Sequence, residues 1–181
     1  MIIRKESNKD IKSRASSGVG IMKTSDITIR PYTPDDAAGI VEMRHNAIQN
    51  VPTVYYDKFT LDEWSEFREG SIQRLLSNSA AIRIVAVINS EIVGYGELVT
   101  KKNLLGACYV LSSAGGKGVG RAIVAELERI AREHGITYLQ LDSSMNAERF
   151  YLNCGYRITE RTKHIMPSGS VMDCVKMHKD L

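Results

Sequence analysis

The sequence predicts one α/β domain with a mixed, mostly antiparallel central sheet of about six to seven strands flanked by about four helices. Three observations support this. Apolar strands are joined by short links between residues 82 and 111, a glycine-rich turn opens an amphipathic helix at residue 119, and two strands flank a turn at Pro167-Ser168-Gly169. Short links favour antiparallel neighbours, because a parallel crossover needs a dozen or more residues. A chain of 181 residues is long enough for one domain with its own core.

Elements of the first half follow from alternation and helix-start signals. Residues 27–30 alternate like a short strand, and Thr33-Pro34-Asp35-Asp36 combines a capping hydroxyl, an early proline and acids, which predicts a first helix. Thr60-Leu61-Asp62-Glu63 has the form of a capping box and predicts a second helix that continues to Leu76, with Gly70 as a weak point. Three strands of a meander are then expected at residues 82–88, 92–99 and 104–111.

The second half is organised around Gly115-Gly116-Lys117-Gly118-Val119-Gly120. The helix that follows has an apolar stripe of Val119, Ile123, Leu127 and Ala131, and Gly135 predicts its end. The remaining elements are a strand at 138–142, a short helix at 147–154 and strands near 156–165 and 171–179.

Charge and composition separate a tail from the folded domain. Residues 1–21 carry five basic and two acidic side chains, which accounts for the whole net charge of +3. Residues 1–25 have no hydrophobic period and are expected to be a disordered basic tail, followed by a domain over 26–181. The neutral domain does not support nucleic-acid binding. No apolar run approaches the roughly 20 residues of a membrane helix, and no signal peptide is evident.

The cysteines indicate a reducing, cytoplasmic setting. Cys108, Cys154 and Cys174 are odd in number, lie far apart and have no metal-ligand spacing. We therefore expect neither a structural disulfide nor a metal site.

The glycine-rich turn predicts an anion site. Glycines let backbone approach a ligand closely, and a helix N-terminus adds unpaired N–H groups and partial positive charge. Together these features suit a pyrophosphate, to which Lys117 and Arg121 would add charge. The alternative is a turn that merely connects two elements.

The turn does not match two other phosphate-binding motifs. A P-loop needs lysine and a hydroxyl after its last glycine, but Arg121 follows Gly120. A dinucleotide fingerprint needs GxGxxG, and this turn is one residue short, although Asp142 occupies the place of a ribose-binding acid. Only 61 residues follow Gly120, too few for the rest of a doubly wound sheet.

Four consecutive segments carry a recognisable pattern: residues 110–120, the helix that follows them, then LQLDSS and AERFYLNCGY. Together they resemble the GNAT superfamily of N-acetyltransferases. The resemblance covers about 155 residues and is most specific over residues 108–156. The matching positions are Tyr109, Val110, Gly116, Gly118, Gly120, Ala147, Phe150, Tyr151, Gly155 and Tyr156.

The resemblance implies acetyl-CoA as co-substrate and direct acetyl transfer to an amine. It assigns pyrophosphate binding to the backbone of Gly116, Lys117, Gly118, Val119, Gly120 and Arg121. It assigns the pantetheine and thioester to the backbone of Cys108, Tyr109 and Val110. Tyr151 would protonate the departing thiolate, as a phenol can.

Several positions depart from the family pattern. Gly115 stands where the family usually has Gln or Arg, and Ser112 stands where it usually has Pro. The family's asparagine falls at Ser144, with Asn146 nearby, so both are candidates for the cofactor contact.

No carboxylate lies in residues 104–111, where the family often has its base. Glu97, on the preceding strand, is then the candidate base. The alternative is that Glu97 is simply a strand residue that faces outward. His45, Asp57 and Asp142 are weaker candidates. Cys108 has no adjacent histidine and is expected to be a small buried residue rather than a nucleophile.

The acceptor is expected to be an amine-bearing small molecule or a protein amino group, recognised by the first two helices. Tyr55, Tyr56 and Trp64 cluster there, either lining a pocket or packing a loop. The alternative functions are a non-catalytic acetyl-CoA-binding regulatory module and an interaction protein that uses the basic tail. Neither nucleic acid nor membrane is an expected partner, and a homodimer is compatible with the sequence.

We predict that the tail is dispensable. A chain that begins at Met22 should keep its melting temperature and its acetyl-CoA affinity, because residues 1–21 have no apolar pattern with which to bury surface. Thermal unfolding and cofactor titration of the shortened chain test this. Loss of folding or of binding would place the domain boundary earlier.

Overall fold

The computed structural model describes residues 27–66, 71–76 and 81–181. The expected tail, residues 1–25, lies outside them, as does the predicted weak point Gly70. In this part of the chain no helix is long and apolar enough to cross a membrane.

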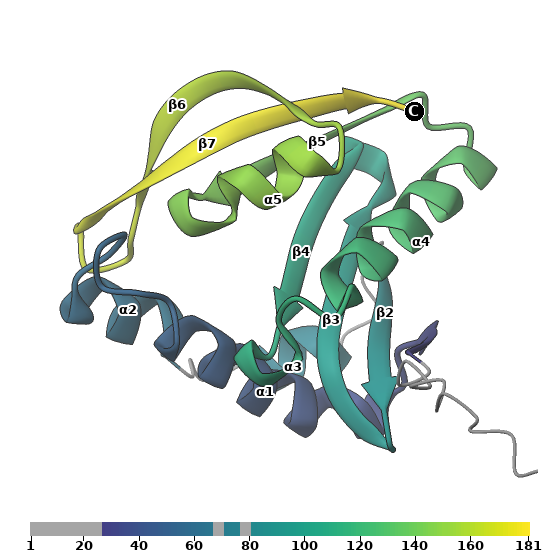
Figure 1. Cartoon of the computed structure of the whole chain (residues 1–181), viewed down its shortest axis with the longest axis horizontal. Coiled ribbons are helices and arrows are strands. Elements are labelled where there is room, and N and C mark those ends of the chain that lie inside the picture. Colours follow the sequence, from purple (N-terminus) through teal and green to yellow (C-terminus); the bar gives the residue numbers. More distant parts are fainter. Residues whose placement is uncertain (1–26, 67–70, 77–80) are drawn as a thin grey trace, which may run out of the picture.

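A seven-stranded sheet forms the centre of the fold (Figure 1), in the order β1-β2-β3-β4-β5-β7-β6. Neighbouring strands are antiparallel except β4 and β5. The predicted mixed, mostly antiparallel sheet is therefore confirmed. The strands are β1 (Thr28–Pro31), β2 (Ala81–Ile88), β3 (Glu91–Val99), β4 (Leu104–Val110), β5 (Tyr138–Ser144), β6 (Arg157–Ile165) and β7 (Val171–Asp180).

Five α-helices are present in the described residues: α1 (Ala37–Gln49), α2 (Lys58–Ser65), α3 (Ser71–Leu76), α4 (Val119–Glu133) and α5 (Glu148–Asn153). Single 3-10 turns precede α1, β4, α4 and α5: Pro34–Asp36, Thr100–Lys102, Ser112–Ala114 and Met145–Ala147. The predicted second helix corresponds to α2 and α3 together. Its predicted start at a Thr60 capping box is wrong, because the Asp57 carboxylate caps α2 by accepting a hydrogen bond from the Thr60 amide at 2.8 Å.

Helices cover both faces of the β1–β4 half of the sheet. Tyr95 of β3 packs in a cluster with Ile40 and Met43 of α1. On the opposite face, Gly94 and Gly96 lie under α4. A Cβ at residue 96 would be 2.5 Å from Ile123 Cγ2, so glycine allows the helix to sit close to the strand.

Strands β4 and β5 pair at a single position, Leu104 with Gln140, and then diverge (Figure 1). The pairing register between β3 and β4 shifts at the same level. Glu97 pairs with Ala107 but Leu98 pairs with Leu105, which leaves Gly106 as a bulge. A bulge bends its strand and increases its twist. Beyond this point, the edge of β4 that faces β5 pairs with no strand among the described residues.

We predict that Gly96→Ala lowers the free energy of unfolding by about 1–3 kcal/mol, the usual cost of overpacking a core. Gly39→Ala is the matched control, since its Cβ would lie at an ordinary 3.4 Å from Ile92 Cδ1. That change should stabilise α1 by about 0.5–1 kcal/mol through helix propensity. Denaturant unfolding measures both, and a neutral Gly96→Ala would mean that residue 96 does not limit the approach of α4.

Candidate active site

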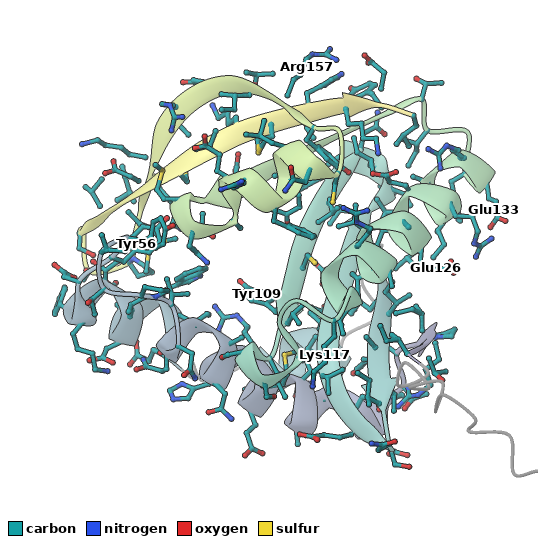
Figure 2. All side chains as sticks on the ribbon, viewed as in Figure 1. Tyr56, Tyr109, Lys117, Glu126, Glu133 and Arg157 are labelled. Carbon is teal, nitrogen blue, oxygen red and sulfur yellow. The ribbon has the colours of Figure 1, made fainter. Side chains whose placement is uncertain are left out.

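The turn before α4 presents a group of unpaired backbone amides. The first amide of the helix region with an intrachain acceptor is that of Ala122, which donates to the Gly118 carbonyl at 3.0 Å. In the described residues, five neighbouring amides have no acceptor: those of Gly116, Gly118, Val119, Gly120 and Arg121. Unpaired amides at a helix N-terminus favour an anionic ligand. Lys117 and Arg121 are exposed beside them, and Figure 2 shows Lys117 in the loop that precedes α4.

Two different requirements explain the glycines of this turn. Gly116 and Gly118 have φ of 72° and 86°, a region that costs other residues energy, and a Cβ at either would meet nothing within 4 Å. A Cβ at Gly120, in contrast, would lie 3.1 Å from Phe150 Cζ. Glycine at 120 is therefore needed for the contact between α4 and α5, a role that the sequence pattern did not reveal.

A cavity of about 350 Å³ lies where β4 and β5 diverge. Its walls include residues 105–110 of β4, 142–144 of β5, and Tyr151 of α5. The structure thus brings together the predicted site residues Cys108, Tyr109, Val110, Ser144, Asn146 and Tyr151.

Tyr151 is buried in the wall of this cavity, with 6% of its surface exposed. Its ring packs edge-on against those of Phe150 and Tyr156, with centroids 5.0 and 5.7 Å away. Burial raises the pKa of Tyr151 well above its ordinary value of 10.0, so the phenol is protonated at neutral pH. Its hydroxyl has no hydrogen-bond partner in the described structure, which leaves it available to a group inside the cavity.

Cys108 contributes to the same cavity as a neutral thiol. Burial raises its pKa from 9.0 to about 12, with the nearby Cys154 adding to the effect. The thiolate is the nucleophilic form of cysteine, so this environment disfavours covalent catalysis at Cys108.

The two candidates for the polar cofactor contact differ in their surroundings. The Oδ1 atom of Asn146 is buried and has no partner among the described residues. Ser144 also lines the cavity, but its hydroxyl is not among the buried side-chain atoms of the described residues that lack a partner. An unpaired buried amide oxygen costs free energy until a ligand donates to it, which favours Asn146 as the contact.

A second cavity of about 350 Å³ adjoins the first across β4. Ile40, Val41 and Arg44 of α1 contribute to it, as do Tyr95 and Glu97 of β3. Five residues line both cavities, namely Trp64, Gly106, Ala107, Tyr109 and His164. Figure 2 shows Tyr109 at the side of β4 that faces the opening between α5 and α1. The two cavities therefore adjoin near Tyr109.

Glu97 lies in the second cavity with one of its oxygens engaged. Its Oε2 accepts hydrogen bonds from Arg83 Nε and the Tyr95 hydroxyl, both at 2.8 Å. Its Oε1 faces Gly106, where an added Cβ would approach that oxygen to 3.2 Å. Glu97 is thus held at the wall of the cavity, with Oε1 directed towards the bulge of β4.

The weaker base candidates are placed differently. His45 contacts the Ser65 carbonyl through Nδ1 at 3.2 Å, and the Asp57 carboxylate caps α2. Neither lines the two cavities. Asp142 reaches the first cavity but is exposed.

The aromatic residues of the α1–α2 region separate into two roles. Tyr56 is buried, and its hydroxyl donates to the Asp173 carbonyl at 2.8 Å while accepting the Met145 amide at 2.6 Å. It therefore holds this region against β7. Trp64 reaches both cavities, whereas Tyr55 is exposed.

Sequence reasoning missed two cavity residues, Arg44 and His164. Arg44 had a usable signal, because it lies one turn after Ile40 and one turn before Ile48, inside the apolar stripe of α1. His164 had no such signal, since it reaches the cavities only through the position of β6 beside β7 at the edge of the sheet. The described residues contain no group of three or more His, Cys, Asp or Glu that could hold a metal ion.

Comparison with known proteins places this arrangement in a family. A family model described as an acetyltransferase (GNAT) domain matches residues 41–177. A search of curated protein sequences gave no match.

Solved structures share the fold. A GCN5-related N-acetyltransferase from Rhodopseudomonas palustris is 25% identical, with a TM-score of 0.81 over 90% of this chain and 100% of that one. PaiA N-acetyltransferase from Thermoplasma acidophilum, in complex with coenzyme A, is 21% identical, with a TM-score of 0.68 over 86% and 99% of the two chains. The putative acetyltransferase yncA from Salmonella typhimurium, with acetyl-CoA, is 22% identical, with a TM-score of 0.59 over 86% and 94%.

The family model covers most of the chain and includes β4, the glycine turn and α5. The resemblance read from the sequence is confirmed, and the chain belongs to the GNAT acetyltransferase family.

Proposed function

We propose that this protein is an N-acetyltransferase that moves an acetyl group from acetyl-CoA directly to an amine. The observation that carries the proposal is the divergence of β4 and β5 beside five unpaired amides. A ligand with a pyrophosphate and an extended, amide-containing arm matches both features. Two solved relatives of the fold hold coenzyme A or acetyl-CoA.

In this proposal the amides of the turn hold the pyrophosphate, with Lys117 and Arg121 adding charge. The pantetheine arm extends along the unpaired edge of β4, next to Cys108, Tyr109 and Val110. The side-chain amide of Asn146 forms a hydrogen bond with the cofactor within the same cavity. The thioester then lies near Tyr109, where the two cavities adjoin.

The chemical step is attack of the neutral amine nitrogen on the thioester carbonyl. A C–N bond forms and the C–S bond breaks, and the sulfur takes its proton from the Tyr151 hydroxyl. A buried site that raises the pKa of a phenol also disfavours a bare thiolate, so this donation lowers the barrier. Glu97 Oε1 takes up the proton lost from the amine, directly or through water, and solvent restores the proton on Tyr151.

We predict that Gly118→Asp weakens acetyl-CoA binding by about tenfold or more relative to Gly118→Asn. Asn and Asp tolerate positive φ better than other residues, and a Cβ here meets nothing within 4 Å. The pair differs in one negative charge beside the pyrophosphate, and two unit charges near 4 Å cost roughly 1–4 kcal/mol at a protein surface.

Titration calorimetry of both variants measures this difference, with their melting temperatures as a check on folding. Equal affinities would remove the phosphate site from the turn. Thermal stabilisation of the wild type by NADPH, with none by acetyl-CoA, would refute the assignment of the co-substrate.

We predict that Tyr151→Phe lowers turnover by about 10²–10⁴-fold, the range for a positioned acid. Acetyl-CoA affinity and melting temperature should change little, because the hydroxyl has no partner in the described structure. Tyr156→Phe is the matched control, since Tyr156 is equally buried beside Tyr151 but does not line the cavity.

Both variants require an acceptor for which chemistry limits turnover. Comparable losses in the two would make the effect structural, and unchanged turnover in Tyr151→Phe would leave Tyr151 as a packing residue.

A further inference from the structure

We propose that the acceptor carries a carboxylate next to its amine and that Arg44 binds this carboxylate. A hydrophobic α-amino acid is the simplest molecule of this class. The inference rests on the proposed acetyl transfer, and it concerns only the second cavity, on the acceptor side of β4.

Arg44 is built into the wall of that cavity. It lies on α1 between Ile40 and Ile48, and it is half-buried. Its guanidinium carbon is 5.4 Å from the centre of the Tyr109 ring, and Nη2 donates to the Trp64 carbonyl at 2.8 Å. The cation is therefore fixed beside the point at which the two cavities adjoin.

The guanidinium of Arg44 has N–H donors that are not used by Trp64. Arginine has five N–H groups, and the bond to Trp64 uses one. Over residues 27–66, 71–76 and 81–181, Arg44 forms no ion pair with a carboxylate. A partly buried cation without a counter-ion is costly, and a ligand carboxylate would remove that cost through two parallel hydrogen bonds.

The acidic residues of the same cavity are directed elsewhere. Glu63 accepts the amide and hydroxyl of Ser168 and the hydroxyl of Ser170 at 2.6–2.8 Å, so it holds the β6–β7 turn. Glu97 accepts from Arg83. Glu66 is exposed. Arg44 is thus the cation positioned to meet an anionic ligand group, while Glu97, across the cavity, suits the ammonium.

Apart from the exposed His164, the other side chains of the cavity are apolar or aromatic. Side chains of Ile40, Val41, Leu75, Tyr95, Trp64 and Met166 line it. A volume of about 350 Å³ is at the lower end of small-molecule sites, so it suits a ligand the size of one amino acid. A lysine side chain of a protein would bring an amine into this cavity without a carboxylate, and Arg44 would remain unpaired.

Matched acceptors test the proposal in the wild-type enzyme. L-Phenylalanine, L-phenylalaninamide and 2-phenylethylamine share one ring and one amine, and only the first has a carboxylate. L-Leucine, L-leucinamide and 3-methylbutylamine form a second set. Initial rates from release of the CoA thiol, with products identified by mass spectrometry, give kcat/KM for each. We expect the carboxylates to be preferred at least tenfold in one set or both.

The variant Arg44→Gln should lower kcat/KM for the preferred amino acid by about 10–100-fold, mainly through KM, as loss of a charged hydrogen-bonded pair implies. The corresponding amine should change less than about threefold. Arg44→Lys keeps the charge but loses the two-pronged geometry. Its kcat/KM for the amino acid should lie between those of the wild type and Arg44→Gln. Arg129→Gln is the control, because Arg129 lies on α4 in exposed ion pairs with Glu126 and Glu133, outside both cavities.

Three outcomes overturn the inference. The wild type could prefer the amides or amines, it could acetylate only protein or peptide amino groups, or Arg44→Gln could reduce all acceptors equally. If instead no amine of any class, peptides included, consumes acetyl-CoA, the proposed function fails. The wild-type comparison stands by itself if an Arg44 variant does not fold.

Discussion

The loss of pairing between β4 and β5 is the constraint on which this site depends. One residue pair joins these two strands, and the edge of β4 beyond it has no neighbouring strand over residues 105–110. Backbone N–H and C=O groups left unpaired in a buried setting cost roughly 1–3 kcal/mol each. Along residues 105–110 the edge of β4 lines a cavity, and an extended ligand with amides of its own can pair with that edge. The bulge at Gly106 bends β4 at the same level, and Gly106 lines the second cavity as well as the first.

Two close contacts hold the groups around that gap in fixed positions. Gly94 and Gly96 let α4 lie directly on β3, which sets where the unpaired amides point. Gly120 lets the ring of Phe150 approach α4, and Phe150 is the neighbour of Tyr151 on α5. The anion site and the phenol are therefore parts of one packed unit. Dipoles and acids contribute most to catalysis when packing holds them in place before the ligand binds.

The features visible in the sequence were those encoded by local pattern. Alternation and short links predicted the meander, and the stripe from Val119 to Ala131 predicted α4. The start of α2 was missed because two capping signals compete within four residues, and Asp57 takes the cap that Thr60 was expected to provide. The packing role of Gly120 could not be seen in the sequence, because the neighbour that requires it, Phe150, is 30 residues away in the chain. His164 was missed for the same reason, since β6 meets the cavities only through tertiary packing, whereas Arg44 had a signal in its place between Ile40 and Ile48 on α1.

Locating acetyl-CoA relative to β4 tests this site most directly. Amide hydrogen exchange, followed residue by residue with and without saturating acetyl-CoA, reports which backbone groups gain partners. We expect new protection in two segments, residues 105–110 along the unpaired edge and 116–121 in the turn, with α1 changing little. Saturable binding that leaves both segments unprotected would contradict this expectation, because the ligand would then occupy a site other than the gap between β4 and β5.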